Sequence, residues 1–429
     1  MSTLKVDVHH ITRVEGHGNV VLDAQDGEIK ECRFEVVEAP RFFEAFVRDR
    51  PYYEINHITS RICGICAVGH STTSAMATET ALGVELTEQA ELLRKLNFHG
   101  EIIDSHVLHT YYLVAPDFFN VGSVIPLVDT NREVVERALR IKKLSGDLCA
   151  MIGGRHTHPC ALVVGGFSHT PTEDELRAMR ERLVNARADM DASVELFSTL
   201  DWPEFERETE YVSLTRDDEY AFVGGTIKSS DGFEYPLEEY RRVTNEEMVA
   251  FSTAKWTHHN RDSYMVGALA RFNNNFDQLH PRGKDAAAKL GIEPIVTNPF
   301  FNSAAQVVEM VHCVEDSIDI IDELLERGVE REEPVAVDVK AGEGVGSCDV
   351  PRGILFHDYA YNEEGFCTEA NCIIPTNQNM ANLNHDMQKL APEIIDRPQE
   401  EVRLLLEMLV RAYDPCISCS THFLTVEFV

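Results

Sequence analysis

The chain has 429 residues, 39 of them basic and 72 acidic, which gives a formal net charge of −33 at pH 7. Nucleic acids and anionic membranes are therefore disfavoured as partners, because they carry the same sign of charge. The sequence has no apolar run near the roughly 18 residues of a membrane span and no signal-peptide pattern at its start, so we expect a cytoplasmic protein without direct membrane insertion.

Apolar and polar side chains alternate over residues 4–38, and Asp26-Gly27 separates two such runs. This pattern predicts an antiparallel hairpin or small sheet, which forms an N-terminal β region over about residues 1–40. Glu15 lies at the end of the first half of this region, where a strand could direct its carboxylate into the protein.

Long helices follow, in a helical core that we expect over about residues 50–200 and 240–330. Two of them begin with capping-box patterns, one at Thr130 and Glu133 and one at Thr170-Pro171-Thr172-Glu173. The predicted helices are 87–114, 130–152, one that starts at 170–173, and 307–325, which is closed by Gly328. Helices of this length can form a central bundle.

The first of these helices carries three histidines, His99, His106 and His109, of which the first two share an apolar stripe. A metal site is one interpretation of such a group. At helical spacing on an apolar face, however, hydrogen-bonded core or interface histidines are the better interpretation, and we predict that role.

Residues 205–240 are acidic and aromatic, with Gly224-Gly225 and an Asp231-Gly232 turn, and they predict a smaller β-rich excursion. The sequence contains no internal repeats, low-complexity tracts or linkers. We therefore predict one large α+β unit over residues 1–429, with a central long-helix bundle and a C-terminal metal-binding segment over about residues 340–429.

The stretch Gly342-x-Gly344-x-Gly346 suggests a nucleotide-binding loop, but it lacks the full spacing of such loops, and no convincing helix follows it. We interpret it as a tight loop that leads into Pro351-Arg352. The chain also has no closely spaced cysteine run of the iron–sulfur type. We therefore expect no iron–sulfur cluster, flavin or nicotinamide in this chain.

Two Cys-x-x-Cys pairs at opposite ends of the chain are the main chemical signal. They lie in Arg61-Ile62-Cys63-Gly64-Ile65-Cys66 and in Asp414-Pro415-Cys416-Ile417-Ser418-Cys419. Two such pairs can supply a tetrathiolate metal site. Structural zinc is the usual interpretation, but zinc ribbons close loops of roughly 15–20 residues, whereas here folding must bring both ends together. Eleven cysteines, an odd number, also argue against a secreted disulfide scaffold.

The residues around both pairs resemble the large subunit of nickel–iron hydrogenases. The resemblance rests on five motifs in the family's order, which together span residues 12–422. They are Thr-Arg-Val-Glu-Gly-His at 12–17, Arg-Ile-Cys-Gly-Ile-Cys-x-x-x-His at 61–70, Asp-Val-Pro-Arg-Gly at 349–353, Ile-Pro-Thr at 374–376 and Asp-Pro-Cys-x-x-Cys-x-x-His at 414–422. The chain length and the ending Arg-Ala-Tyr-Asp-Pro-Cys are most similar to the cytoplasmic, multi-subunit bidirectional branch of the family.

The resemblance implies a nickel–iron centre held by the four cysteines. Cys63 and Cys416 would be terminal ligands of nickel, and Cys66 and Cys419 would bridge nickel to an iron that carries carbon monoxide and two cyanides. His70 would donate a hydrogen bond to the bridging Cys66, which tunes the basicity of that sulfur.

Glu15 would be the first proton relay, within reach of the thiolate of Cys416. A carboxylate buried beside thiolates has its pKa raised by desolvation and by its negative neighbours, which suits proton transfer near neutral pH.

Arg352, which follows Pro351, would lie over the open coordination position near the cyanides, with Asp414 and Asp117 as the carboxylates that hold it. In the family this arginine is a proposed base for H₂ cleavage. Thr376 would donate a hydrogen bond to the second cyanide. The family usually continues with Thr-Trp-Asn or similar after this threonine, whereas this chain continues with Asn-Gln-Asn at 377–379.

A separate hard cation, Mg²⁺ or Fe²⁺, is also implied near the C-terminus. Its ligands would be Glu44, His422 and the carbonyl oxygen of Cys372. Large subunits of this family are often cut after the terminal histidine, whereas here residues 423–429 follow it. Their alternating pattern predicts a strand that packs without cleavage.

The implied reaction is H₂ ⇌ 2H⁺ + 2e⁻, with electrons passed to an iron–sulfur small subunit. Further flavin- or nicotinamide-binding subunits would lead to a nicotinamide, deazaflavin, heterodisulfide or ferredoxin acceptor, and maturation proteins would supply carbon monoxide and cyanide. The alternatives are the large subunit of a membrane-bound energy-converting hydrogenase, a quinone-type structural relative, which would lack the four cysteines, and a zinc protein.

Overall fold

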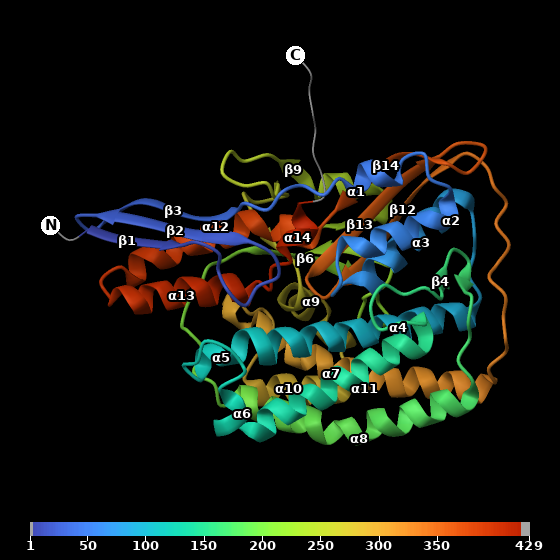
Figure 1. Cartoon of the computed structure of the whole chain (residues 1–429), viewed down its shortest axis with the longest axis horizontal. Helices are drawn as coiled ribbons and strands as arrows, with labels where there is room; N and C mark the ends of the chain where they lie inside the picture. Colours follow the sequence, from blue (N-terminus) through green and yellow to red (C-terminus); the bar gives the residue numbers. More distant parts are fainter. Residues whose placement is uncertain (1–2, 422–429) are drawn as a thin grey trace, which may run out of the picture.

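The N-terminal strands form an antiparallel sheet that extends from one end of the molecule (Figure 1). In this computed structural model, which describes residues 3–421, the strands are β1 (Thr3–Val8), β2 (Gly18–Gln25) and β3 (Glu28–Val36). Asp26 and Gly27 make the β2–β3 turn with φ of 54° and 82°. A two-residue hairpin turn of this type needs positive φ at both positions. The predicted N-terminal sheet is confirmed.

Long helices pack side by side in the lower part of Figure 1. They are α4 (Glu88–Val107), α7 (Arg132–Gly153), α8 (Glu173–Ser198), α10 (Pro281–Leu290) and α11 (Asn302–Arg327). Helix α11 packs against α4, α8 and α10, and its side chains from Asn302 to Glu315 are all buried. The predicted central bundle is confirmed.

The helix ends differ in part from those predicted. Gly328 follows α11 with a φ of 81°, as the sequence indicated. The capping box of α8 exists but lies two residues later than predicted: Thr172 and Glu175 form it, so Pro171 precedes the helix instead of lying in its first turn. The capping box predicted at Thr130 is wrong: Thr130 ends the short helix α6 (Leu127–Thr130), and α7 starts after Asn131 with no side-chain cap.

The predicted helix 87–114 is interrupted near its C-terminal end. Helix α4 gives way at Leu108 to a π-helical segment, η2 (Leu108–Val114), and then to α5 (Ala115–Phe118). Such π-helical turns insert an extra residue and often lie beside functional sites.

The three histidines of this segment are hydrogen-bonded in the core, as predicted. Imidazole nitrogens of His106 and His109 lie 2.7 Å from Glu309 Oε2 and 2.5 Å from Gln306 Oε1, and His99 Nδ1 lies 3.4 Å from the Ser317 hydroxyl. Among residues 3–421, the group that meets the geometry for a metal ion consists of Cys63, Cys66, Cys416 and Cys419.

A second antiparallel sheet carries the Asp-Val-Pro-Arg-Gly motif. Its strands are β12 (Gly342–Val350), β13 (Gly353–Tyr361) and β14 (Cys367–Ile373), and β12 packs on α3 (Ala67–Leu82). The predicted tight loop at 342–346 is wrong, because these glycines belong to β12. A Cβ at Gly342, Gly344 or Gly346 would collide with the backbone of α3, so glycine permits the close contact.

The β-rich segment forms a four-stranded sheet, in the order β11–β6–β7–β8. The strands are β6 (Glu210–Thr215), β7 (Thr226–Ser229), β8 (Glu234–Tyr235) and β11 (Tyr264–Met265). A second buried cluster joins this sheet to the β13 side chains Ile354 and Phe356. Strands β9 (Asn245–Glu247) and β10 (Trp256–His258) also occupy part of the range predicted as helical core, and helix resumes only at α9 (Ala268–Asn275).

The remaining elements connect these layers. They are α1 (Phe43–Val47), α2 (Tyr52–Thr59), η1 (Ser60–Ile62), β4 (Leu162–Val163), β5 (Gly166–Phe167), η3 (Leu237–Arg242), η4 (Phe276–Gln278), η5 (Pro299–Phe301), α12 (Pro375–Ile394), α13 (Gln399–Ala412) and α14 (Ile417–Ser420). Helices α12 and α13 contact the N-terminal sheet.

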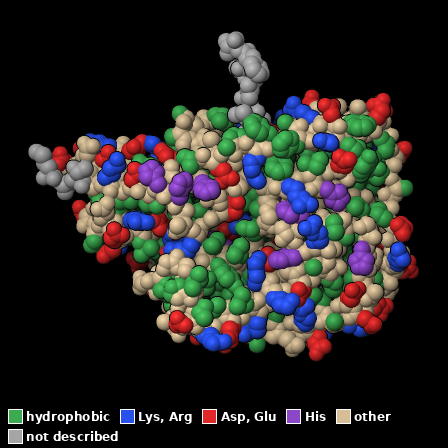
Figure 2. All heavy atoms as spheres, in the orientation of Figure 1, with side chains coloured by type: hydrophobic (Ala, Val, Ile, Leu, Met, Phe, Trp, Pro, Cys, Tyr) green, Lys and Arg blue, Asp and Glu red, His purple; other side chains and the backbone are tan. Residues whose placement is uncertain are grey.

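Charged side chains of both signs are interspersed over the face seen in Figure 2. Within residues 3–421, none of the helices combines the length and the apolar character needed to cross a membrane.

The close contact of β12 with α3 predicts a large effect of Gly344→Ala. The new Cβ would meet backbone atoms of Ala77 and Ala81, so overpacking should lower the free energy of unfolding by about 1–3 kcal/mol. Denaturant unfolding measures this change. Gly122→Ala is the control, because a Cβ at Gly122 has nothing within 4 Å. Equal midpoints for the two variants would contradict the close contact.

Candidate metal centre

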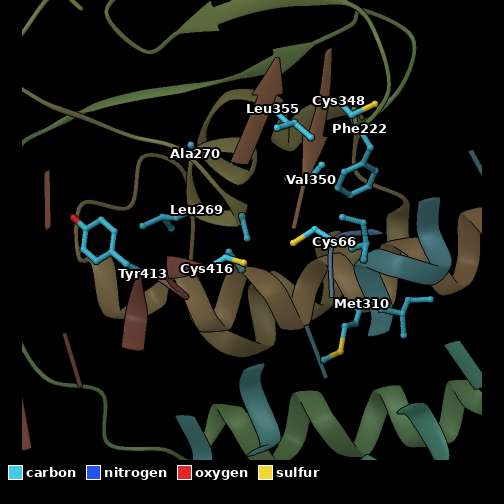
Figure 3. Packing of buried hydrophobic residues seen from close by; sticks show 14 of the residues in the cluster. Cys66, Phe222, Leu269, Ala270, Met310, Cys348, Val350, Leu355, Tyr413 and Cys416 are labelled. Carbon is cyan, nitrogen blue, oxygen red and sulfur yellow. The ribbon is translucent and has the colours of Figure 1, made fainter. Parts of the chain in front are cut away.

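Four buried cysteine sulfurs meet in the middle of the molecule. Cys63 follows η1 and Cys66 directly precedes α3, while Cys416 directly precedes α14 and Cys419 lies within it. The Sγ–Sγ distances are 3.6 Å for Cys63–Cys66, 3.4 Å for Cys63–Cys416 and 2.8 Å for Cys416–Cys419, and all four atoms lie within 4.8 Å of one another. Figure 3 shows the sulfurs of Cys66 and Cys416 directed toward each other.

Local backbone geometry directs these sulfurs inward. The Cys63 sulfur accepts the N–H groups of Ile65 and Cys66, both at 3.3 Å, which tightens the loop between the first pair. The N–H of Cys416 donates to the Thr376 hydroxyl at 3.1 Å, which ties the second pair to the start of α12. Each pair is therefore held by hydrogen bonds to the protein itself.

Burial and mutual proximity perturb the thiols. Burial raises the pKa values of the Cys416 and Cys419 thiols well above the ordinary value of a cysteine. Hydrogen bonds from Cys416, Cys419 and Cys66 lower the pKa of Cys63 well below its ordinary value. A cation among the sulfurs would offset the cost of ionising the thiols whose pKa is raised, because a metal ion binds the thiolate and displaces the thiol proton. Four thiolates form a soft donor set, which fits nickel, low-valent iron or zinc.

Arg352 lies beside this cluster. Its Nη1 donates to Cys66 Sγ at 3.3 Å and to the Ser105 hydroxyl at 3.2 Å, and its Nη2 donates to Asp414 Oδ1 at 2.8 Å. Burial by itself lowers the pKa of Arg352, but Asp414 and the cysteine thiolates outweigh it and raise the pKa well above its ordinary value. The guanidinium is thus a fixed positive charge against the sulfurs.

Glu15 reaches the cluster from the N-terminal region. Its Oε2 lies 3.3 Å from Cys416 Sγ and accepts the N–H of Ser418 at 2.9 Å. The Glu15 carbonyl also accepts the N–H of Ile417 at 3.0 Å, which forms an isolated bridge between the two segments. The structure therefore places a carboxylate in contact with a cysteine sulfur.

Two of the three residues predicted for the hard-cation site, Glu44 and Cys372, are in contact. Glu44 is buried, and its Oε1 accepts the N–H of Cys372 at 2.9 Å. The third predicted ligand, His422, and the tail 423–429 lie outside the described residues.

Two further predicted positions have defined neighbours. His70 is buried at the start of α3, and its Nδ1 lies 3.3 Å from His357 Nε2. The Thr376 hydroxyl accepts from Cys416, as described above, and Pro351 supplies a carbonyl oxygen to Arg271 Nη2 at 3.2 Å.

The predicted pairing of Asp117 with Arg352 is wrong. Asp117 lies in α5, and both of its carboxylate oxygens accept from Arg411 Nη1 at 2.9 Å, while Arg13 bonds Oδ1. The π-helical segment before α5 and the end of α13 place Asp117 in this arginine cluster, whereas Arg352 takes Asp414 as its carboxylate.

Sequence reasoning missed three residues that organise the site. Arg41 donates to the carbonyl oxygens of Ile62 and Ser418, so it joins the two Cys-x-x-Cys segments. Ser105 bonds Arg352, and Gln306 donates to Asp414 Oδ2 at 3.1 Å. Only Arg41 had a signal in the sequence, because it shortly precedes the predicted cation ligand Glu44.

The buried cluster predicts that Asp117→Asn destabilises the protein strongly. The change removes a carboxylate from between two buried or nearly buried arginines, and breaking such a pair costs about 3–5 kcal/mol. Thermal unfolding measures the loss. Asp189→Asn is the control, since its partner Arg140 is 47% exposed and surface pairs contribute about 0–1 kcal/mol. Similar melting temperatures for both variants would exclude a stabilising role for Asp117.

Comparison with known families gives matches over most of the chain. A family model described as nickel-dependent hydrogenase matches residues 41–135 and 220–422, and a model described as HoxL-like matches residues 5–39. Among curated proteins, the alpha subunit of sulfhydrogenase 1 from Pyrococcus furiosus is 36% identical over 98% of both chains. The alpha subunit of sulfhydrogenase 2 from the same organism is 32% identical, over 97% of this chain and 99% of that protein.

Solved structures agree with these matches. The crystal structure of an NAD⁺-reducing NiFe-hydrogenase in the H₂-reduced state superposes with a TM-score of 0.87 and 27% identity, over 98% of this chain and 100% of that one. An NiFeSe hydrogenase from Desulfovibrio vulgaris Hildenborough, 22% identical with a TM-score of 0.80 over 98% of this chain and 100% of that one, shows the same fold. The chain therefore belongs to the nickel-dependent hydrogenase family, in which it is the large subunit of an NiFe hydrogenase.

Proposed function

We propose that this subunit holds a nickel–iron centre in its four thiolates and catalyses the reversible cleavage of H₂ to protons and electrons. The observation that carries the proposal is the buried set of four sulfurs, which lies in contact with both Glu15 and Arg352. In the proposed arrangement Cys63, Cys66, Cys416 and Cys419 would together hold the nickel and an iron that carries carbon monoxide and two cyanides.

When bound, the nickel–iron centre would supply the soft-metal position at which H₂ is polarised. The contribution of Glu15 is proton transfer. Its Oε2 is held toward Cys416 Sγ by the N–H of Ser418, so the carboxylate can accept a proton from the Cys416 thiol and pass it outward. Because the donor and acceptor atoms are already 3.3 Å apart, this step needs little rearrangement.

Arg352 contributes positive charge where the sulfurs concentrate negative charge. Asp414 accepts from its Nη2 through the carboxylate and from its Nε through the backbone carbonyl, both at 2.8 Å, which fixes the guanidinium plane. Electrostatic stabilisation of this kind is strong in a site that excludes water. The raised pKa of Arg352 favours this role over that of a proton acceptor.

The outer parts of the site have supporting contacts. We propose that His70 and Thr376 make hydrogen bonds around the centre, to Cys66 and to a cyanide respectively. We also propose that Glu44, His422 and the carbonyl of Cys372 bind Mg²⁺ or Fe²⁺. The bond between Glu44 and the N–H of Cys372 supports the last assignment, because it brings these two residues together.

We propose that the partner that receives the electrons is an iron–sulfur small subunit. Further flavin or iron–sulfur subunits would pass them to a nicotinamide, flavin, deazaflavin or ferredoxin acceptor, and maturation proteins would install carbon monoxide and cyanide. The similarity to an NAD⁺-reducing enzyme supports nicotinamide among these acceptors. A cytoplasmic location completes the proposal.

Metal analysis of the purified complex tests the centre. We expect about one nickel per chain, and an infrared spectrum with one carbonyl band and two cyanide bands. Cys66→Ser should remove both signals, because it deletes a thiolate of the cluster. Cys149→Ser, at a buried cysteine of α7 outside the cluster, should keep them. Zinc in place of nickel in the unmodified complex would refute the proposal.

The proton-transfer role predicts the behaviour of Glu15→Gln. The amide keeps the shape of the side chain but cannot accept the proton, so H₂ oxidation should fall roughly 100-fold to 10,000-fold, with nickel content unchanged. Assays of H₂-dependent dye reduction measure this loss. Glu35→Gln, a glutamate of β3 that bonds Arg33, should retain full activity. Normal turnover in Glu15→Gln would mean that the proton leaves by another path.

A further inference from the structure

Arg271 is a fully buried arginine that none of the motifs contains. It lies in α9, and its guanidinium binds two carboxylates that are also 0% exposed. Nε and Nη2 donate to Glu309 of α11, both at 2.7 Å, and Nη1 donates to Asp349 of β12 at 2.6 Å. One side chain therefore joins a helix of the bundle to the strand that carries the Asp-Val-Pro-Arg-Gly motif.

The same guanidinium also binds the backbone of the turn before Arg352. Nη1 donates to the carbonyl oxygen of Val350 at 2.8 Å, and Nη2 donates to that of Pro351 at 3.2 Å. All five N–H groups of the side chain are thus used on this cluster, as only the forked geometry of arginine allows. Two of the five bonds go to the residues that immediately precede Arg352.

Helix α9 makes a second contact with the chain around Arg352, through Gly267, which directly precedes the helix. Gly267 is one helical turn before Arg271, has a φ of 112°, and would place a Cβ 3.3 Å from the Arg352 carbonyl oxygen. The backbone at the start of α9 therefore lies directly against Arg352. In Figure 3 the α9 residue Leu269 is drawn above and to the left of Cys416, and the β12 residue Val350 is drawn above Cys66.

Other residues also form hydrogen bonds with the two carboxylates of the cluster. Tyr220 and His106 bond the two oxygens of Glu309, each at 2.7 Å, and the N–H of Leu214 donates to Asp349 Oδ2 at 2.9 Å. Burial raises the pKa of Asp349 to about 6, against the attraction of Arg271. Ion clusters this deep are often no more stabilising than apolar side chains of similar size. What this cluster provides beyond stability is a fixed geometry.

We propose that Arg271, held by Glu309 and Asp349, is a positioning residue that sets the 349–352 turn so that the Arg352 guanidinium meets Cys66 and Asp414. The inference rests on the proposed role of Arg352 in catalysis. A displacement of about 1 Å at a reacting group can cost roughly 100-fold in rate. Lysine at 271 would keep the charge but lose the fork that spans two carboxylates and two carbonyls.

The test is a double-mutant cycle on turnover normalised to nickel. Arg271→Lys should lower kcat roughly 10-fold to 100-fold, and Arg352→Lys should lower it at least as much. If Arg271 acts through Arg352, the double variant should be no slower than Arg352→Lys alone, because residues that act as a unit are non-additive. An effect of Arg271 on turnover that is independent of Arg352 would instead multiply the two losses.

Arg94→Lys is the matched control. Arg94 is buried, binds Glu79 with two bonds of 2.7 and 2.8 Å, and joins α4 to α3 away from Arg352. Arg94→Lys should lower the melting temperature, as we also expect for Arg271→Lys, and it should leave kcat per nickel unchanged. Equal kcat losses in Arg94→Lys and Arg271→Lys would overturn the proposal.

Amide hydrogen exchange gives a readout that needs no turnover. Peptides that cover residues 345–356 should exchange faster in Arg271→Lys than in Arg94→Lys, whether or not nickel is loaded. If Arg271→Lys loads no nickel, Glu309→Gln replaces it in the cycle with the same expectation of non-additivity. Unchanged exchange, or normal kcat in Arg271→Lys, would refute the positioning role. Normal kcat in Arg352→Lys would refute the proposed function of Arg352 instead.

Discussion

Closure of the two Cys-x-x-Cys segments onto each other is the constraint on which the site depends. Cys63 and Cys416 are 353 residues apart in sequence, yet their sulfurs are 3.4 Å apart. Arg41 binds backbone carbonyls of both segments, and Glu15 binds the second segment through its backbone and its carboxylate. Closing so long a loop costs conformational entropy, which the packing of the whole chain has to offset. The cysteine site is therefore a property of the completed fold.

Close backbone contact brings the other half of the site into place. Alternate glycines let β12 lie directly on α3, because no side chain separates the two backbones. Gly69, near the start of α3, faces Val350 at the end of β12. Cys66, just before α3, and Arg352, just after β12, consequently lie 3.3 Å apart through Sγ and Nη1. This packing contact thus brings the sulfur cluster and its positive charge close together.

Buried arginines carry the electrostatics of an otherwise acidic protein. Arg271, Arg352 and Arg411 are each at most 2% exposed, and each binds at least one carboxylate. A guanidinium keeps its charge when buried and offers several donors in fixed directions. The three side chains therefore link elements that are distant in sequence, and Arg352 places positive charge against the thiolates without a mobile counter-ion. This arrangement suits a centre that must be organised before the substrate arrives.

The sequence by itself determined the local features of this protein. The Asp26-Gly27 turn, a helix start close to 170–173 and the period that ends at Gly328 follow from short-range physics, and the five motifs identified the family. Tertiary structure decided the rest. Asp117 pairs with Arg411 and not with Arg352, and the glycines at 342–346 form a strand and not a loop. Charge partners and close backbone contacts are set by which elements pack together. The alternate glycines are visible in the sequence, but the helix on which they pack is not.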